Sequence, residues 1–138
     1  NRIASATFSY FDTGKKPSRK TEPERFYHGF VLGLIVDLSD RYEITSNRES
    51  GFGRYDVMLK PKGLKEKSTP AIIMEFKVCN PKHEKNLEET VEAALMQIRE
   101  KGYASALITQ GIPEENIRGY GFAFEGENVL IGGGSIML

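Results

Sequence analysis

Ile73-Met74-Glu75-Phe76-Lys77 is an apolar stretch that carries two opposite charges two residues apart. Because side chains alternate across a β-strand, Glu75 and Lys77 are expected on one face, about 7 Å apart along the chain. The residues expected on the other face are all apolar: Ile72, Met74, Phe76 and Val78. Charged groups on so apolar a strand are costly unless they are paired or bind a ligand. A divalent-metal site acting on phosphate needs both charges, whereas the alternative is a solvated strand face with a weak ion pair.

The strand expected before this stretch opens with Gly53-Arg54-Tyr55-Asp56. Between the two strands, residues 61–70 contain prolines, lysines and a glycine, which favour an antiparallel hairpin. In the simplest register Asp56 lies directly opposite Glu75, where Cβ atoms are about 5 Å apart. Two carboxylates at that distance repel each other unless a cation lies between them. The two strands therefore predict a cation site, although Asp56 alone is also compatible with a surface position.

The rest of the chain predicts an α/β fold, with a central mixed sheet flanked by helices. The expected elements are a helix over 22–38, strands over 42–46, 54–60 and 71–78, a helix over 87–101, a strand near 104–109 and a hairpin from 118–124 to 128–132. Thr21 and Glu24 have the spacing of a capping box, and apolar residues on every side of the first helix indicate a buried helix. Residues 1–20 are interpreted as an entering arm or interdomain linker, 21–132 as the folded domain and 133–138 as a flexible tail.

Composition narrows the class of protein. The chain has 138 residues, enough for one domain with a substantial core. Its 19 basic residues balance its 19 acidic residues, which counts mildly against tight, non-specific binding of nucleic acid. No apolar run is long enough to span a membrane, and the lone Cys79 fits a reducing compartment, which predicts a cytoplasmic protein. The first residue is Asn1 rather than Met, which suggests a piece of a longer protein.

Asp56 and Glu75-Phe76-Lys77, within an order of helix, three strands, helix and strand, resemble the PD-(D/E)XK nuclease superfamily. The resemblance implies an α-β-β-β-α-β core with a C-terminal hairpin, and it runs from about Phe8 to Ile131. Three further blocks resemble, more narrowly, the subfamily whose nuclease domain follows an AAA-type ATPase-like domain: Phe26-Tyr27-His28-Gly29-Phe30, Asn47-Arg48-Glu49-Ser50-Gly51 and Gln97 to Tyr103. That ATPase-like domain lies outside this chain, so the resemblance implies a domain linked to it in cis.

The resemblance also implies hydrolysis of DNA phosphodiester bonds with one or two Mg²⁺ or Mn²⁺ ions. Asp56 and Glu75 would bind the metal together with the backbone carbonyl of Phe76. Lys77 would orient the attacking water or stabilise negative charge on the phosphate. His28 matches a first-helix histidine that joins the metal site in RecB-like members. Hard oxygen ligands suit Mg²⁺, which is commonly held by one or two carboxylates together with substrate phosphate.

Two interpretations remain for several residues and for the function of the protein. Gln97 matches a glutamine that supports the lysine and the substrate, and Tyr103 completes its motif, but a solvated amide and a packing aromatic are alternatives. His28 is a ligand by resemblance, whereas a hydrogen-bonded core histidine is the commoner case in a buried helix. Glu49 is either an auxiliary ligand or a loop residue paired with a neighbouring arginine. The alternative function is a catalytically silent module that binds nucleic acid or regulates a larger ATPase-linked protein. RNA is the alternative substrate.

Overall fold

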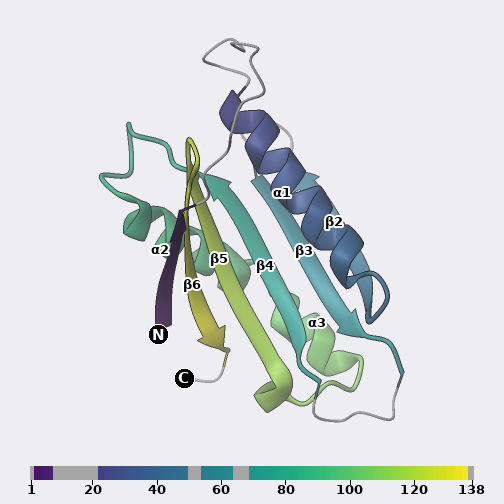
Figure 1. Ribbon diagram of the computed structural model, residues 1–138. Helices are drawn as coiled ribbons and strands as arrows, with labels where there is room; N and C mark the ends of the chain where they lie inside the picture. Colours follow the sequence, from purple (N-terminus) through teal and green to yellow (C-terminus); the bar gives the residue numbers. More distant parts are fainter. Residues whose placement is uncertain (1, 8–21, 50–53, 64–68, 137–138) are drawn as a thin grey trace.

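The computed structural model describes residues 2–7, 22–49, 54–63 and 69–136, with side chains over 29–47, 56–63 and 69–136. In chain order the elements are β1 (Arg2–Thr7), α1 (Glu22–Leu38), β2 (Tyr42–Glu49), β3 (Arg54–Pro61), β4 (Ala71–Val78), α2 (Leu87–Glu100), α3 (Tyr103–Thr109), a 3₁₀ turn (Glu114–Asn116), β5 (Ile117–Glu125) and β6 (Asn128–Ser135). The strands form one mixed sheet in the order β1-β6-β5-β4-β3-β2, with α1 on one face and α2 and α3 on the other (Figure 1). Among the described residues, no helix is long and apolar enough to cross a membrane.

The α/β fold class and most of the predicted elements are confirmed. The helix predicted over 22–38 and the strand predicted over 71–78 coincide with α1 and β4. The second predicted helix ends one residue earlier, at Glu100. The C-terminal hairpin is also present, as β5 and β6, and both strands extend beyond the predicted limits.

The pairing of the central strands determines which residues lie opposite each other on neighbouring strands. β3 and β4 are antiparallel with Asp56 opposite Glu75, which confirms the predicted register. β4 and β5 are parallel, whereas the other neighbouring strands are antiparallel. Parallel neighbours cannot be joined by a tight turn, so the chain crosses the sheet through α2 and α3 between them. This crossover brings two helices onto the face that carries Asp56 and Glu75.

The prediction of a strand near 104–109 is wrong, because this segment forms the helix α3. A short apolar run fits either a strand or a helix when periodicity is the only guide. In α3 only Leu107 is fully buried, and it packs in a cluster with Ile73 and Ile117. One buried side chain in two helical turns suits a short surface helix that covers the sheet within the β4–β5 crossover.

Two segments expected outside the folded domain contribute strands. Residues 2–7, within the expected arm 1–20, form β1 and pair antiparallel with β6. β6 continues to Ser135, so the sheet includes residues expected in the flexible tail 133–138. The outer edge of β6 has backbone donors and acceptors that pair with β1. Because this pairing uses backbone groups, no pattern of side chains predicts it. Residues 8–20 lie outside the described residues.

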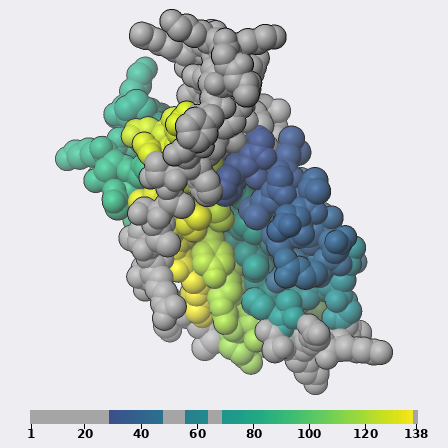
Figure 2. All heavy atoms as spheres, viewed as in Figure 1, coloured from purple at the N-terminus to yellow at the C-terminus, as the bar shows by residue number. Residues whose placement is uncertain are grey.

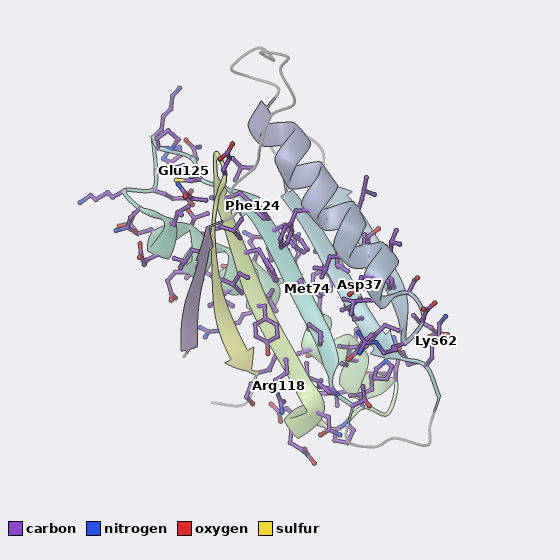
Figure 3. All side chains as sticks on the ribbon, viewed as in Figure 1. Asp37, Lys62, Met74, Arg118, Phe124 and Glu125 are labelled. Carbon is purple, nitrogen blue, oxygen red and sulfur yellow. The ribbon has the colours of Figure 1, made fainter. Side chains whose placement is uncertain are left out.

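The face of the sheet under α1 is an aromatic core. Phe30 of α1 lies against Phe76, Phe122 and Phe124, with ring centroids 6.5, 6.0 and 5.4 Å away. Met74 and Phe124, labelled in Figure 3, belong to the same buried cluster. The apolar face predicted for β4 is therefore confirmed, and it lies toward α1.

α1 is not buried on every side, contrary to the prediction. Leu32 and Val36 are 62% and 72% exposed, and Figure 2 shows this helix at the surface of the molecule. The residues that face the sheet recur at helical spacing: Phe30, Val31, Leu34, Ile35 and Leu38. The described part of α1 thus covers the sheet with one side, although its outer side is also apolar in places.

Candidate metal-binding site

Asp56 on β3 and Glu75 on β4 form a pair of buried carboxylates. They are cross-strand partners, and Asp56 is 3% exposed and Glu75 0%. Both side chains point to the face that α2 and α3 cover, because both lie close to the same nitrogen atom, Lys101 Nζ. The predicted pairing of Asp56 with Glu75 on one face is therefore confirmed, whereas metal binding by the pair stays a prediction.

Lys101, the residue after α2, places its ammonium group between these carboxylates. Its Nζ lies 3.0 Å from Asp56 Oδ2 and 3.9 Å from Glu75 Oε1. Burial lowers the pKa of Lys101, whereas two carboxylates at these distances favour its charged form. The positive charge that the strand register demands is therefore supplied by an amine of the chain itself. Sequence reasoning missed Lys101, although its position one helical turn after Gln97 was an available signal.

Tyr103, the first residue of α3, also contacts the carboxylate pair. Its hydroxyl donates a hydrogen bond to Asp56 Oδ2 at 2.6 Å. Burial raises the pKa of Tyr103, and the neighbouring Asp56 and Glu75 raise it further, so the phenol keeps its proton and acts as a donor. Asn47, the β2 partner of Asp56, acts in the opposite direction and lowers the pKa of Tyr103. Tyr103 thereby fixes the orientation of the Asp56 carboxylate.

Local features of the crossover bring the end of α2 to this point. Asn86 Oδ1 accepts a hydrogen bond from the Glu89 N–H at 2.9 Å and caps the start of the helix. At Gly121 of β5 a Cβ atom would lie 2.9 Å from the Val91 carbonyl oxygen, so α2 packs directly against the strand backbone. Gly102, with φ of 67°, turns the chain between α2 and α3, and its two neighbours both reach the same carboxylate.

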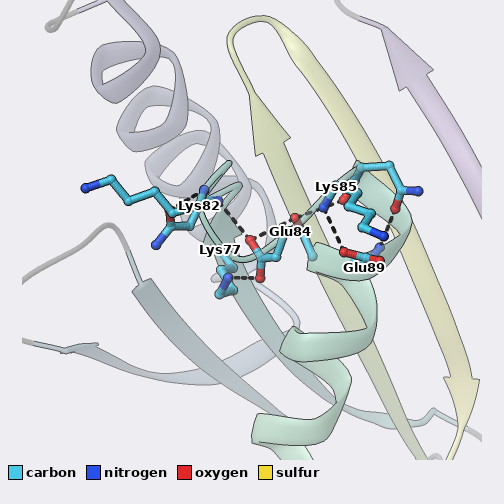
Figure 4. A network of polar contacts seen from close by, with 8 residues as sticks. Lys77, Lys82, Glu84, Lys85 and Glu89 are labelled. Carbon is cyan, nitrogen blue, oxygen red and sulfur yellow. Dashed lines mark hydrogen bonds and ion pairs between the residues drawn. The ribbon is translucent and has the colours of Figure 1, made fainter.

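Lys77 lies on the same strand face as Glu75 but has a different partner. Its ammonium group forms an ion pair with Glu84, in the loop before α2 (Figure 4). Glu84 also accepts hydrogen bonds from the Asn80 N–H at 2.8 Å and from Thr90 Oγ1 at 3.1 Å. Burial opposes the charge of Glu84, but the Asn80 N–H and Lys77 outweigh it and hold the pKa of Glu84 below its usual value. Glu84 is a second residue that sequence reasoning missed, since a glutamate in a polar loop carries no distinctive signal.

The remaining predicted site residues are Gln97, Phe76, His28 and Glu49. Among the described side chains, none of them forms a hydrogen bond or ion pair with Asp56 or Glu75. Gln97 is half-buried on α2, one turn before Lys101. The Phe76 ring is buried on the opposite face of the sheet, in the cluster under α1. His28 belongs to α1 and Glu49 ends β2, and both side chains lie outside the described ones. The roles of these residues stay predictions.

The donor set fits a divalent cation. Among the described residues no group of three His, Cys, Asp or Glu side chains is placed to hold a metal ion. Mg²⁺ does not need such a group, because it is usually held by one or two carboxylates, with waters and substrate phosphates completing its shell. Asp56 and Glu75 meet this requirement, since both are buried and already face a common positive charge.

Asp56, Glu75 and Lys77 lie on one face of the mixed sheet, and Lys101 reaches the two carboxylates from the end of α2. Carboxylates that bind a divalent ion can support hydrolysis of a phosphodiester. A family model of the PD-(D/E)XK nuclease superfamily matches residues 22–133. The chain therefore belongs to this superfamily, whose members are generally nucleases and typically use divalent metals such as Mg²⁺. The narrower resemblance to the ATPase-associated subfamily and to RecB-like members stays a prediction. Comparison with curated proteins and with solved structures gave no significant match.

Proposed function

We propose that this domain is a metal-dependent nuclease that hydrolyses phosphodiester bonds of DNA, with Asp56 and Glu75 binding Mg²⁺ or Mn²⁺. The single observation that carries the proposal is the convergence of two buried carboxylates, from neighbouring strands, on one cation position. Membership of the PD-(D/E)XK nuclease superfamily supports the reaction class. The choice of DNA, and of these two metals, rests on the resemblance in sequence.

The residues around the carboxylates have distinct roles in this proposal. A bound divalent ion would supply an activated water and neutralise charge on the phosphate. Tyr103 holds the Asp56 carboxylate in place through its hydroxyl at 2.6 Å. Lys77 assists catalysis by presenting positive charge to the phosphate, from a position that Glu84 fixes. Gln97 would support the substrate from α2.

Further parts of the proposal rest on the resemblance alone. His28, the Phe76 backbone carbonyl and Glu49 are proposed as additional metal ligands. The domain is proposed to act in cis with an AAA-type ATPase-like domain, in the cytoplasm. No membrane partner is proposed.

The proposal is tested by incubating the purified domain with DNA in Mg²⁺ and in Mn²⁺, beside the variants Asp56→Asn and Glu75→Gln. Both variants remove a ligand charge at almost constant shape, so cleavage should fall by at least about 100-fold. Asp37→Asn is the matched control, because Asp37 is an exposed carboxylate on α1 and its loss should leave cleavage unchanged.

Binding of metal is measured separately by calorimetric titration with Mn²⁺, which Asp56→Asn should abolish. Wild-type protein that binds DNA but cuts it with neither metal would instead support the silent module that binds nucleic acid or regulates a partner. Cleavage of RNA with DNA left intact would overturn the choice of substrate but retain the metal site.

A further inference from the structure

We propose that Lys101 is an internal counter-cation, whose ammonium group occupies the metal position between Asp56 and Glu75 until a divalent ion displaces it. Lys101 thereby sets the metal affinity of the site. The inference deepens the proposed function, on which it depends for the identity of Asp56 and Glu75 as metal ligands.

The position of Lys101 Nζ is the first support. At 3.0 Å from Asp56 Oδ2 and 3.9 Å from Glu75 Oε1, the ammonium group neutralises part of the repulsion between two carboxylates that are almost completely buried. An ion bound by the same two carboxylates needs the same space. The ammonium group and the metal therefore exclude each other.

The charge of this cluster is the second support. Within the cluster of Asp56, Glu75 and Lys101, two carboxylates and one ammonium group carry a formal charge of minus one. Lys77 does not cancel it, because its ammonium group is paired with Glu84. A divalent ion in place of the Lys101 ammonium group would balance both carboxylates, so the exchange is electrostatically favoured.

The exchange requires a lysine side chain that can move out of the site. Lys101 meets this requirement, whereas Lys77 does not. The Lys101 side chain is 21% exposed, whereas the side chains of Lys77 and Glu84 are each 8% exposed. Lys101 follows the last residue of α2, so its ammonium group can reach water by rotation of its own side chain. Asp56 stays oriented after such a movement, because Tyr103 still donates to its Oδ2.

Displacement is tested by acetylating the lysines of the whole chain with a limiting amine-reactive reagent, with and without Mg²⁺, and measuring each site by mass spectrometry. Mg²⁺ should raise the acetylation of Lys101 several-fold. Lys77 is an internal control that stays protected in both states, and the exposed Lys82 is one that stays reactive in both. In Asp56→Asn, Mg²⁺ should not change the reactivity of Lys101. Unchanged or reduced acetylation of Lys101 in the wild type with Mg²⁺ would overturn the inference.

Competition is tested by calorimetric titration with Mn²⁺ of Lys101→Met and Lys101→Arg. The methionine variant removes the competing charge and should bind Mn²⁺ on the order of tenfold more tightly than wild type. The arginine variant keeps a cation and should bind close to wild type, as should the control Lys82→Met. Equal or weaker binding by Lys101→Met contradicts the inference.

The two proposals fail in different ways. Mn²⁺ binding by the wild type with no change at Lys101 sinks the counter-cation and leaves the nuclease proposal intact. Displacement of Lys101 by Mg²⁺ in a protein that cuts no nucleic acid contradicts the nuclease proposal and supports the counter-cation. Absence of any metal binding by the wild type overturns both.

Discussion

Two clusters of buried charge lie on the same face of the sheet, and they are built differently. In the first, Lys77 and Glu84 pair one ammonium group with one carboxylate, and backbone and hydroxyl donors complete the hydrogen bonding. In the second, Asp56 and Glu75 share the ammonium group of Lys101. Counted over these described groups, the first cluster is balanced, whereas the second keeps a formal negative charge. The comparison teaches that charge balance separates a cluster whose charges are matched within the folded chain from one that can still accept a cation.

The two clusters also divide a motif that is continuous in sequence. Glu75 and Lys77 are two residues apart on β4, yet each belongs to a different cluster. α2 supports both, since Thr90 in its first turn bonds Glu84 and Lys101 follows its last residue. The helix therefore determines which lysine lies beside which carboxylate.

The largest effect is expected from breaking the balanced cluster. Lys77→Met leaves Glu84 as a buried carboxylate without its ammonium partner, so the free energy of unfolding should fall by about 3 kcal/mol. Urea unfolding of the metal-free domain measures this change. The double variant Lys77→Met/Glu84→Gln removes both charges and should recover part of the loss. A loss no greater than that of the control Lys82→Met would show that the pair is not buried in solution.

A smaller effect is expected in the second cluster from Tyr103→Phe, which removes one donor and leaves Asp56 its contact with Lys101. The loss should be about 1.5 kcal/mol, the contribution of a hydrogen bond to a charged group. The matched control is Tyr120→Phe, a half-buried tyrosine packed in the cluster under α1. Equal effects of the two substitutions on urea unfolding would contradict the assigned hydrogen bond.

The smallest effect is a pH dependence that belongs to the balanced cluster. The pKa of Glu84 lies below its ordinary value of 4.5 in the folded protein, so the carboxylate binds a proton more readily when unfolded. Its stabilisation is therefore fully present above pH 4.5 and is lost as the pH falls through the lower, folded pKa. The stability difference between wild type and Glu84→Gln should shrink between pH 6 and pH 3. A difference that grows on acidification would reverse the assigned direction of the pKa shift.

Much of the fold could be predicted because its signals are local. Strand alternation identified the apolar face of β4, and the composition of the loop before it identified the hairpin. The run 104–109 could not be assigned in this way, because a short apolar segment lacks a decisive period and only its place in the crossover makes it helical. β1 escaped prediction because its pairing depends on the backbone edge of β6.

By itself the sequence determined that Asp56 and Glu75 face each other. The period of two places both side chains on one face, and the simplest register across the hairpin loop sets them opposite each other. Only the tertiary structure decided which groups complete the site. Lys101 and Asp56 are 45 positions apart in the chain, and their contact depends on how α2 packs against the backbone at Gly121. Contacts of that range follow from the packing of whole elements, which no local pattern of side chains encodes.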